Sequence, residues 1–118
     1  MNSTKRLIGV YGHYHNNTVA SILSNYGFMR HNFWDLWHNE RYFFEKRNFR
    51  LNYDIIIPNC RTQEELEFIK YNNGKIIYIT KYRDNNWKDY GFDYHISNFK
   101  SKQELEKKLR YSVLSDLY

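Results

Sequence analysis

The sequence predicts a single α/β domain built on a mainly parallel sheet of about four strands. Short apolar runs that suit buried strands alternate along the chain with stretches whose apolar residues have helical spacing. Strands separated by helices pair in parallel through right-handed crossovers. At 118 residues the chain has the length of one domain, and it contains no repeat or linker. We therefore expect one domain over residues 1–118.

Four segments have the composition of buried strands. The clearest is Asp54–Pro58, because three consecutive isoleucines disfavour a helix and the proline ends the run. The other three are Lys5–Tyr11, Lys75–Thr80 and Phe92–Ser97. Lys81–Gly91, between the last two strands, is polar and charged, and we expect a loop with the position of a lid.

Helices are predicted between and after these strands. Thr18–Tyr26 has apolar residues at helical spacing, with Thr18 as its N-cap, and Gly27 ends it. Thr62 followed by two glutamates marks the start of a helix that runs to Asn73–Gly74. Ser101 begins a capping box ahead of the final, leucine-containing helix.

Composition and charge favour a protein that carries no membrane span. The single Cys60 excludes an internal disulfide, and no apolar run is long enough for a signal peptide or a transmembrane helix. We expect an intracellular, cytoplasmic protein with no membrane partner. The formal charge of +5 favours nucleotides, nucleic acid or an acidic protein surface without choosing among them.

The stretch Leu7–Ala20 has the layout of a phosphate-binding P-loop. An apolar strand runs into Gly12, a short polar loop follows, and Thr18 then opens a helix. The loop nevertheless lacks the second glycine and the lysine of G-x-x-x-x-G-K-[ST]. Ligands of open parallel sheets bind beyond the carboxyl ends of the strands, where the loop 12–17 would meet Asn59–Arg61 and Lys81–Arg83.

Several segments together resemble the deoxynucleoside monophosphate kinases of phages and bacteria. They are Ile8–Gly12, Thr18–Ala20, Tyr26–Phe28 before an aromatic helix, Asp54–Arg61, Gly74–Ile79 and Asp93–Asn98. The resemblance implies a P-loop kinase fold, a three-layer α/β/α sandwich. It also implies an origin in a virus, and then a location in the cytoplasm of the host cell.

Departures from this family bear on activity. With Thr18 aligned to the family's threonine, the loop is about two residues short, and Asn16 and Asn17 stand in place of the glycine and the lysine. Asn59 replaces an acidic residue, whereas Arg61 matches. The resemblance thus implies no catalytic residue, and the candidates for a retained nucleotide or phosphate site are Gly12, Asn17, Thr18, Arg61, Lys81 and Arg83.

Simpler interpretations stand beside several of these assignments. Thr18 as an N-cap is favoured over Thr18 as a magnesium ligand. Arg61 has the alternative of pairing with Glu64 or Glu65, and Cys60 suits a buried position better than a nucleophilic one. His13 and His15 are two residues apart, but no supporting ligand stands at a suitable spacing, so we expect no metal site.

The segment Asn32–Lys46 is unusually aromatic and is expected to form one or two helices. Its stripe of Phe33, Trp37 and Phe44 suits core packing, which is the favoured interpretation. Aromatic and basic side chains left at the surface would suit a partner-binding face, and the candidates are Trp34, Trp37, Arg41 and Tyr42.

Two functional hypotheses follow. The favoured one is a catalytically degenerate protein of nucleotide-kinase type that binds or inhibits a host or viral protein and needs no cofactor. The alternative is an active or nucleotide-binding deoxynucleoside monophosphate kinase, using Mg²⁺ and ATP, in which Lys81 or Arg83 replaces the missing lysine. Nucleic-acid binding is less favoured, because the positive charges are spread along the chain.

Overall fold

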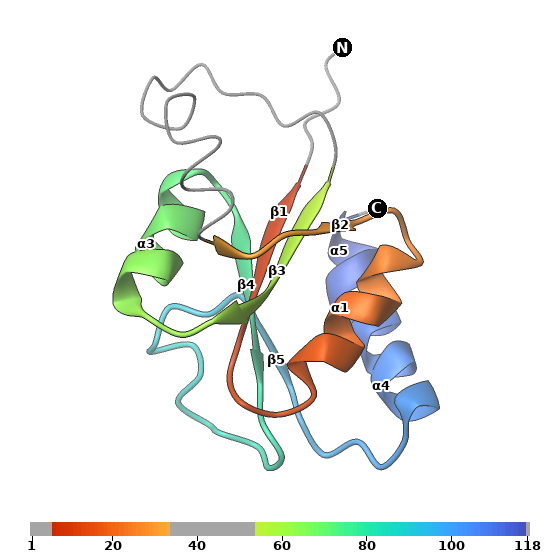
Figure 1. Cartoon of the computed structure of the whole chain (residues 1–118). Helices are drawn as coiled ribbons and strands as arrows, with labels where there is room; N and C mark the ends of the chain where they lie inside the picture. The colour runs from red at the N-terminus through yellow and green to blue at the C-terminus, as the bar shows by residue number, and fades with distance from the viewer. Residues whose placement is uncertain (1–5, 34–53, 118) are drawn as a thin grey trace.

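The computed structural model, which describes residues 6–33 and 54–117, contains a five-stranded parallel sheet (Figure 1). The strand order is β2-β3-β1-β4-β5, and every pairing is parallel. The strands are β1 (Leu7–Tyr11), β2 (Met29–Arg30), β3 (Ile55–Cys60), β4 (Lys75–Ile79) and β5 (Tyr94–Ile96). The four predicted strands are confirmed. The fifth strand, β2, was not predicted, because two exposed residues form too short a pattern to indicate a strand.

The central strand is β1, which pairs with β3 on one side and with β4 on the other. Its side chains alternate between the two faces of the sheet. Ile8 and Val10 lie in the core of one face, and Leu7 lies in the core of the other. A strand buried on both faces explains why this segment is apolar at nearly every position.

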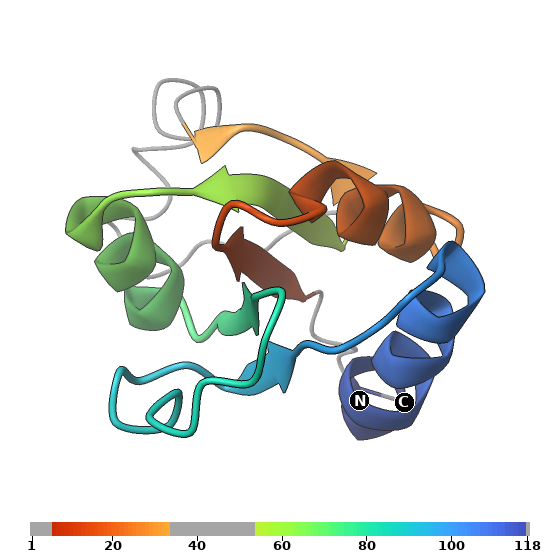
Figure 2. The same ribbon diagram turned by 90° about the horizontal axis from the view of Figure 1, so that it is seen from below.

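Helices cover both faces of the sheet, so the predicted α/β/α layering is confirmed (Figure 2). One face carries α1 (Asn16–Ser24) and the C-terminal helical run, and the other carries α3 (Gln63–Tyr71). The C-terminal run consists of α4 (Lys102–Leu109), the π-helical segment η1 (Arg110–Leu114) and α5 (Ser115–Leu117).

Gly9 allows α3 to lie close to the sheet. A Cβ at this position would stand 2.3 Å from Cδ1 of Ile69 and 2.8 Å from Sγ of Cys60. On the same face, Phe33 packs edge-on against Phe68, with the ring centroids 5.1 Å apart. Phe33 is therefore a core residue, as its stripe predicted, whereas the rest of the aromatic segment lies outside the described residues.

The structure confirms two of the three predicted N-cap residues and corrects the third. Thr62 caps α3 in a reciprocal capping box with Glu65, as predicted. Ser101 caps α4 as predicted, but the capping box is not completed, because the Glu104 carboxylate accepts from the backbone N–H of Lys100 and not from that of Ser101. Thr18 was wrongly predicted as the N-cap of α1, because the helix begins at Asn16 and its N-cap is His15, with a left-handed φ of 58°. Thr18 instead lies in the first turn, since the loop closes sooner than the hydrophobic spacing indicates.

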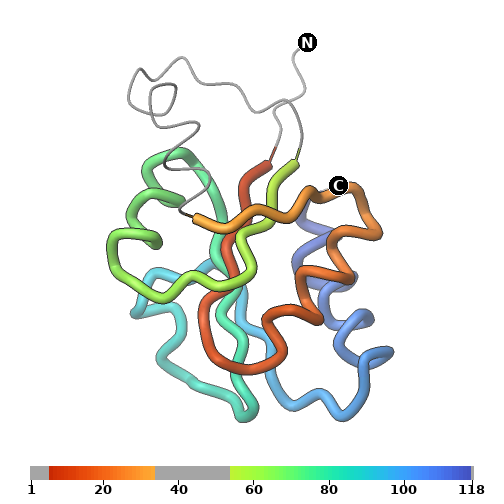
Figure 3. Tube along the Cα trace, in the orientation of Figure 1, coloured from red at the N-terminus to blue at the C-terminus, as the bar shows by residue number. Residues whose placement is uncertain are grey.

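The segment Lys81–Gly91 forms the loop that the sequence predicts, with successive turns between β4 and β5. The carboxyl ends of β1, β4 and β5 point to the same edge of the sheet (Figure 3). All helices in the described ranges are too short or too polar to serve as a transmembrane span.

Candidate functional site

The loops after β1 and β3 border an open cavity of about 380 Å³ at the carboxyl edge of the sheet. Polar residues from the β1–α1 loop, from the first turn of α1 and from the end of β3 line it. They are Gly12, His13, His15, Asn16, Asn17, Thr18, Asn59 and Arg61. Four of the predicted site residues are thus brought together, namely Gly12, Asn17, Thr18 and Arg61.

Gly12 is required by the path of the loop. Its φ is 131°, and a Cβ there would stand 2.3 Å from the carbonyl oxygen of Ile79 on β4. The backbone of the loop therefore passes directly against the neighbouring strand. A side chain at this position would push the loop away from β4.

The buried side chain of Asn16 holds the β1–α1 loop in place by hydrogen bonds. Its side chain is 6% exposed, and its Nδ2 donates to the carbonyl oxygens of Gly12 and Pro58, each at 3.0 Å. Its Oδ1 is buried and has no hydrogen-bond partner in the described part of the chain. The carboxamide therefore joins the β1–α1 loop to β3 while leaving one acceptor unsatisfied.

The sequence indicated Asn16 only as a departure from the P-loop pattern and gave no sign of this role. One of its two partners, Pro58, lies 42 residues away along the chain. The sequence carries no signal for this contact, because the burial of Asn16 depends on how the β1–α1 loop packs against β3.

Asn17 and Thr18 lie in the first turn of α1. The Oδ1 of Asn17 accepts a hydrogen bond from the Arg30 guanidinium on β2, a residue that the sequence did not single out. Thr18 is half-buried and also lines a neighbouring cavity of about 290 Å³, beside Tyr14 and Phe99. The start of α1 thus lies between a polar cavity at the β1 loop and a second, more apolar one beside Tyr14 and Phe99.

Arg61 follows β3 and is exposed. Its backbone N–H donates to the Glu65 carboxylate, which also accepts from the backbone N–H of Thr62 at 3.2 Å. Within residues 6–33 and 54–117, no ion pair joins the Arg61 guanidinium to Glu64 or Glu65. The expected alternative, a side-chain pair with these glutamates, is therefore absent there, and Arg61 lines the cavity instead.

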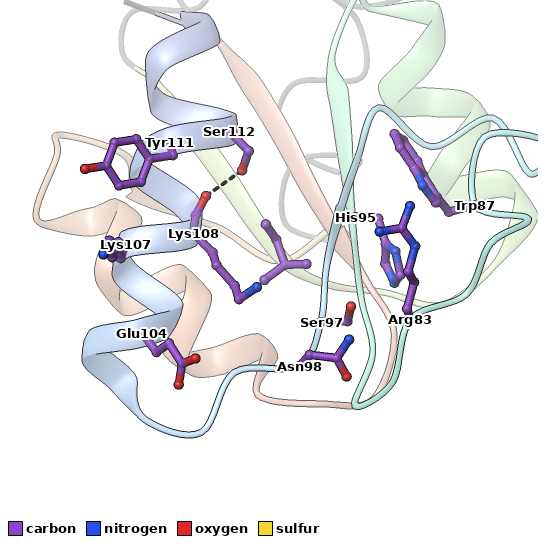
Figure 4. A pocket seen from close by; sticks show the side chains of 11 residues that line it. Arg83, Trp87, His95, Ser97, Asn98, Glu104, Lys107, Lys108, Tyr111 and Ser112 are labelled. Atoms are coloured by element: carbon purple, nitrogen blue, oxygen red, sulfur yellow. Dashed lines mark hydrogen bonds between the residues drawn. The ribbon is translucent and has the colours of Figure 1, made fainter.

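Lys81 and Arg83 lie elsewhere. The Nζ of Lys81 is 5.5 Å from the centroid of the Tyr82 ring, and Nε of Arg83 donates to Asn85 at 2.9 Å. Arg83 lines a different cavity of about 600 Å³, between the β4–β5 loop and α4 (Figure 4). Neither residue lines the cavity at the β1 loop.

The remaining candidates are those for a partner-binding face and for a metal site. Trp34, Trp37, Arg41 and Tyr42 lie outside the described residues. Across the described ranges, no three histidine, cysteine, aspartate or glutamate side chains are grouped as a metal site would require.

Cys60 is a core residue. It is 1% exposed, and burial, with the Glu65 carboxylate as the second cause, raises the pKa of its thiol from 9.0 to about 12. A buried thiol of this kind is protonated at neutral pH and is a poor nucleophile.

Comparisons with known proteins support the fold alone. No family model and no curated protein matches the chain. The chain is similar to a solution NMR structure of a de novo designed P-loop fold protein, with a TM-score of 0.52 and 14% sequence identity over 98% of this chain and 94% of that one. The chain therefore has a P-loop-like α/β fold.

Proposed function

We propose that this protein is a non-catalytic relative of the nucleotide kinases, which binds a partner protein and does not transfer phosphoryl groups. The observation that carries the proposal is the position of Asn16, whose carboxamide holds the Gly12 and Pro58 carbonyls at the centre of the loop. A viral origin and action in the host cytoplasm, which the sequence resemblance implies, belong to the same proposal.

Phosphoryl transfer makes demands that this loop does not meet. An active P-loop turns successive backbone N–H groups toward the β-phosphate and places a lysine against the β- and γ-phosphates. Here a side-chain amide binds two backbone carbonyls, and Asn17, at the lysine position, is engaged by Arg30. Among the described residues that line the cavity, Arg61 is the only lysine or arginine.

Nucleotide binding without catalysis is the second candidate, and it has its own support. Thr18, Arg61 and Gly12 line one cavity, at the edge where open parallel sheets bind their ligands. An arginine and a hydroxyl together suit a phosphate group. Under this alternative, Mg²⁺ and ATP would still find part of their site.

Phosphoryl transfer and nucleotide binding can be measured on the same sample. The protein is incubated with ATP or GTP and each deoxynucleoside monophosphate, with and without Mg²⁺, and nucleoside diphosphate formation and thermal unfolding are followed. We expect no product above the protein-free background. We also expect no saturable rise of the unfolding temperature, since a nucleotide that bound the native state would raise it.

The Arg61→Ala variant separates the two candidates further. If a nucleotide raises the unfolding temperature of the parent protein and not of this variant, the cavity binds nucleotide and the second candidate holds. Diphosphate formation that requires Mg²⁺ would contradict both non-catalytic interpretations.

A further inference from the structure

A third cavity lies at the edge of the sheet, away from the β1 loop. It has a volume of about 600 Å³, and β5 runs along it between the β4–β5 loop and the C-terminal helices (Figure 4). We call it the edge groove. Its lining residues are Arg83, Trp87, His95, Ile96, Ser97, Asn98, Glu104, Lys107, Lys108, Tyr111 and Ser112.

The edge groove exposes one side of a strand. In the described sheet, β5 is the last strand and pairs with β4 alone. The backbone N–H of Thr80 on the β4 side donates to the carbonyl oxygen of Ile96 at 3.1 Å. Because backbone groups of successive strand residues point to opposite sides, those of His95 and Ser97 point away from β4. An unpaired edge of this kind is a template for another strand.

Positive charge lines both walls of the edge groove. Figure 4 shows Lys107 and Lys108 on the α4 wall and Arg83 on the opposite wall. Glu104 is the single carboxylate among the lining residues, and it accepts a hydrogen bond from the backbone N–H of Lys100 at 2.8 Å. The groove therefore complements an acidic ligand.

The walls also carry aromatic surface. Tyr111, on the helical wall, is 71% exposed, and Trp87 lies on the opposite wall, with its ring centroid 6.1 Å from that of His95. The His95 ring is held in place by stacking on Tyr78 at 5.3 Å and by the Thr80 hydroxyl, 2.8 Å from Nε2. Aromatic surface of this kind suits the side chains of a docked peptide, and His95 offers it in a fixed orientation.

We propose that an acidic, extended segment of a partner protein adds to β5 as an additional strand in the edge groove. Its alternate side chains face opposite walls, so that carboxylates at neighbouring positions reach Lys107 and Lys108 on one wall and Arg83 on the other. This inference rests on the proposed binding function and names the chemistry of the partner. An open strand edge favours a peptide over a nucleic acid, because only a peptide backbone can pair with it.

Charged side chains beside an edge strand have another use, which is to prevent pairing with other strands. The experiment must therefore separate backbone pairing from charge attraction. The probe is a short, fluorescein-labelled peptide of glutamate and valine, and binding to the full chain is followed by fluorescence anisotropy. The comparison probes are the same peptide N-methylated at alternate residues, its lysine-containing counterpart and a labelled oligothymidylate.

We expect the acidic peptide to bind, and N-methylation to weaken binding about tenfold or more, because it removes the peptide's strand-pairing N–H groups. The Lys107→Glu/Lys108→Glu variant should weaken binding to a similar extent. Lys102→Glu is the matched control on the same helix, since Lys102 is exposed and lies outside the edge groove, and it should leave the affinity unchanged within about twofold. Arg83→Glu tests the opposite wall and replaces the double variant if α4 fails to fold.

Four results would overturn the inference: no binding of the acidic peptide, equal binding of the N-methylated peptide, preference for the lysine peptide, or tighter binding of oligothymidylate that the charge reversals abolish. The last result would assign the groove to nucleic acid. None of them bears on phosphoryl transfer, so failure of this inference and failure of the proposed function are distinguishable.

Discussion

At the scale of single residues, the chemistry of the β1 loop depends on one carboxamide. Asn16 donates both of its amide hydrogens to backbone carbonyls, one in its own loop and one at the end of β3. Such a side chain satisfies two carbonyls that water reaches poorly. The cost is the unpaired Oδ1, which marks this position as one where packing and polarity are in conflict.

Replacing Asn16 by alanine should destabilise the protein by about 2 kcal/mol, because the Gly12 and Pro58 carbonyls lose their donor inside the structure. Urea unfolding measures the effect. Asn17→Ala is the matched control, since Asn17 is exposed and its loss should cost no more than about 0.5 kcal/mol. Equal stability of the two variants would show that the Asn16 amide does not hold the loop.

At the scale of elements, α3 is the helix whose start is best explained by its sequence. The Thr62 hydroxyl accepts from the backbone N–H of Glu65 at 3.2 Å, and the Glu65 carboxylate accepts from the backbone N–H of Thr62 at 3.2 Å. The same carboxylate also accepts from the backbone N–H of Arg61, whose side chain is among those that line the cavity at the β1 loop. The cap therefore fixes the start of α3 and the position of Arg61 together.

Loss of the cap should be measurable at this scale. We expect Thr62→Ala to lower the free energy of unfolding by about 1 kcal/mol, because a helical N–H loses its acceptor. Thr62→Ser keeps the hydroxyl and should stay close to the parent protein in the same denaturation experiment. A serine variant as unstable as the alanine variant would point to the lost methyl group instead of the cap.

At the scale of the whole molecule, burial stabilises the neutral form of one cysteine and two tyrosines, which lie in the core or at its border. Burial raises the pKa of the Cys60 thiol to about 12. Burial and the hydrogen bond to Asp116 raise the pKa of Tyr94, and burial and Asp84 raise that of Tyr78. Each group keeps its proton in the folded chain at a pH where the unfolded chain releases it.

The direction of the pH effect follows from this. A raised native pKa gives stability that is complete below the pKa of the unfolded chain and is lost as pH rises toward the native pKa. We expect the free energy of unfolding to fall from about pH 9 upward, with Cys60 contributing a slope of at most about 1.4 kcal/mol per pH unit.

Chemical denaturation between neutral and alkaline pH measures this loss. Cys60→Ala removes the thiol and should make the alkaline loss shallower, whereas Tyr94→Phe removes a second contribution. An unchanged pH profile in Cys60→Ala would contradict the role assigned to the buried thiol.

Local signals were sufficient for much of the fold and for part of the site. The isoleucines of β3 and the caps at Thr62 and Ser101 depend on neighbours in sequence, so they were predictable. The start of α1 was not, because the left-handed conformation of His15 shortens the loop. Strand order predicted the gathering of Gly12, Thr18 and Arg61, but it wrongly added Lys81 and Arg83, neither of which lines that cavity.

The remaining features depend on contacts between distant segments. The Asn16 amide binds the carbonyl oxygen of Pro58, 42 residues away in the sequence. Arg83, Lys107 and Lys108 line the same edge groove, although they come from different elements. The spacing of apolar residues within one segment does not predict contacts between segments that lie far apart in the sequence. The same holds for β2, whose two residues pair with β3 only once the sheet exists.

The basic walls of the edge groove also determine how the protein behaves toward its own copies. Joining two molecules through β5 would bring Arg83, Lys107 and Lys108 of one next to the same three side chains of the other. Like charges at that distance repel, and a strand of three residues offers few backbone hydrogen bonds in compensation. We therefore expect the charged walls to disfavour pairing of β5 with a second copy of the chain, while the same edge accepts a segment of opposite charge under the inference above.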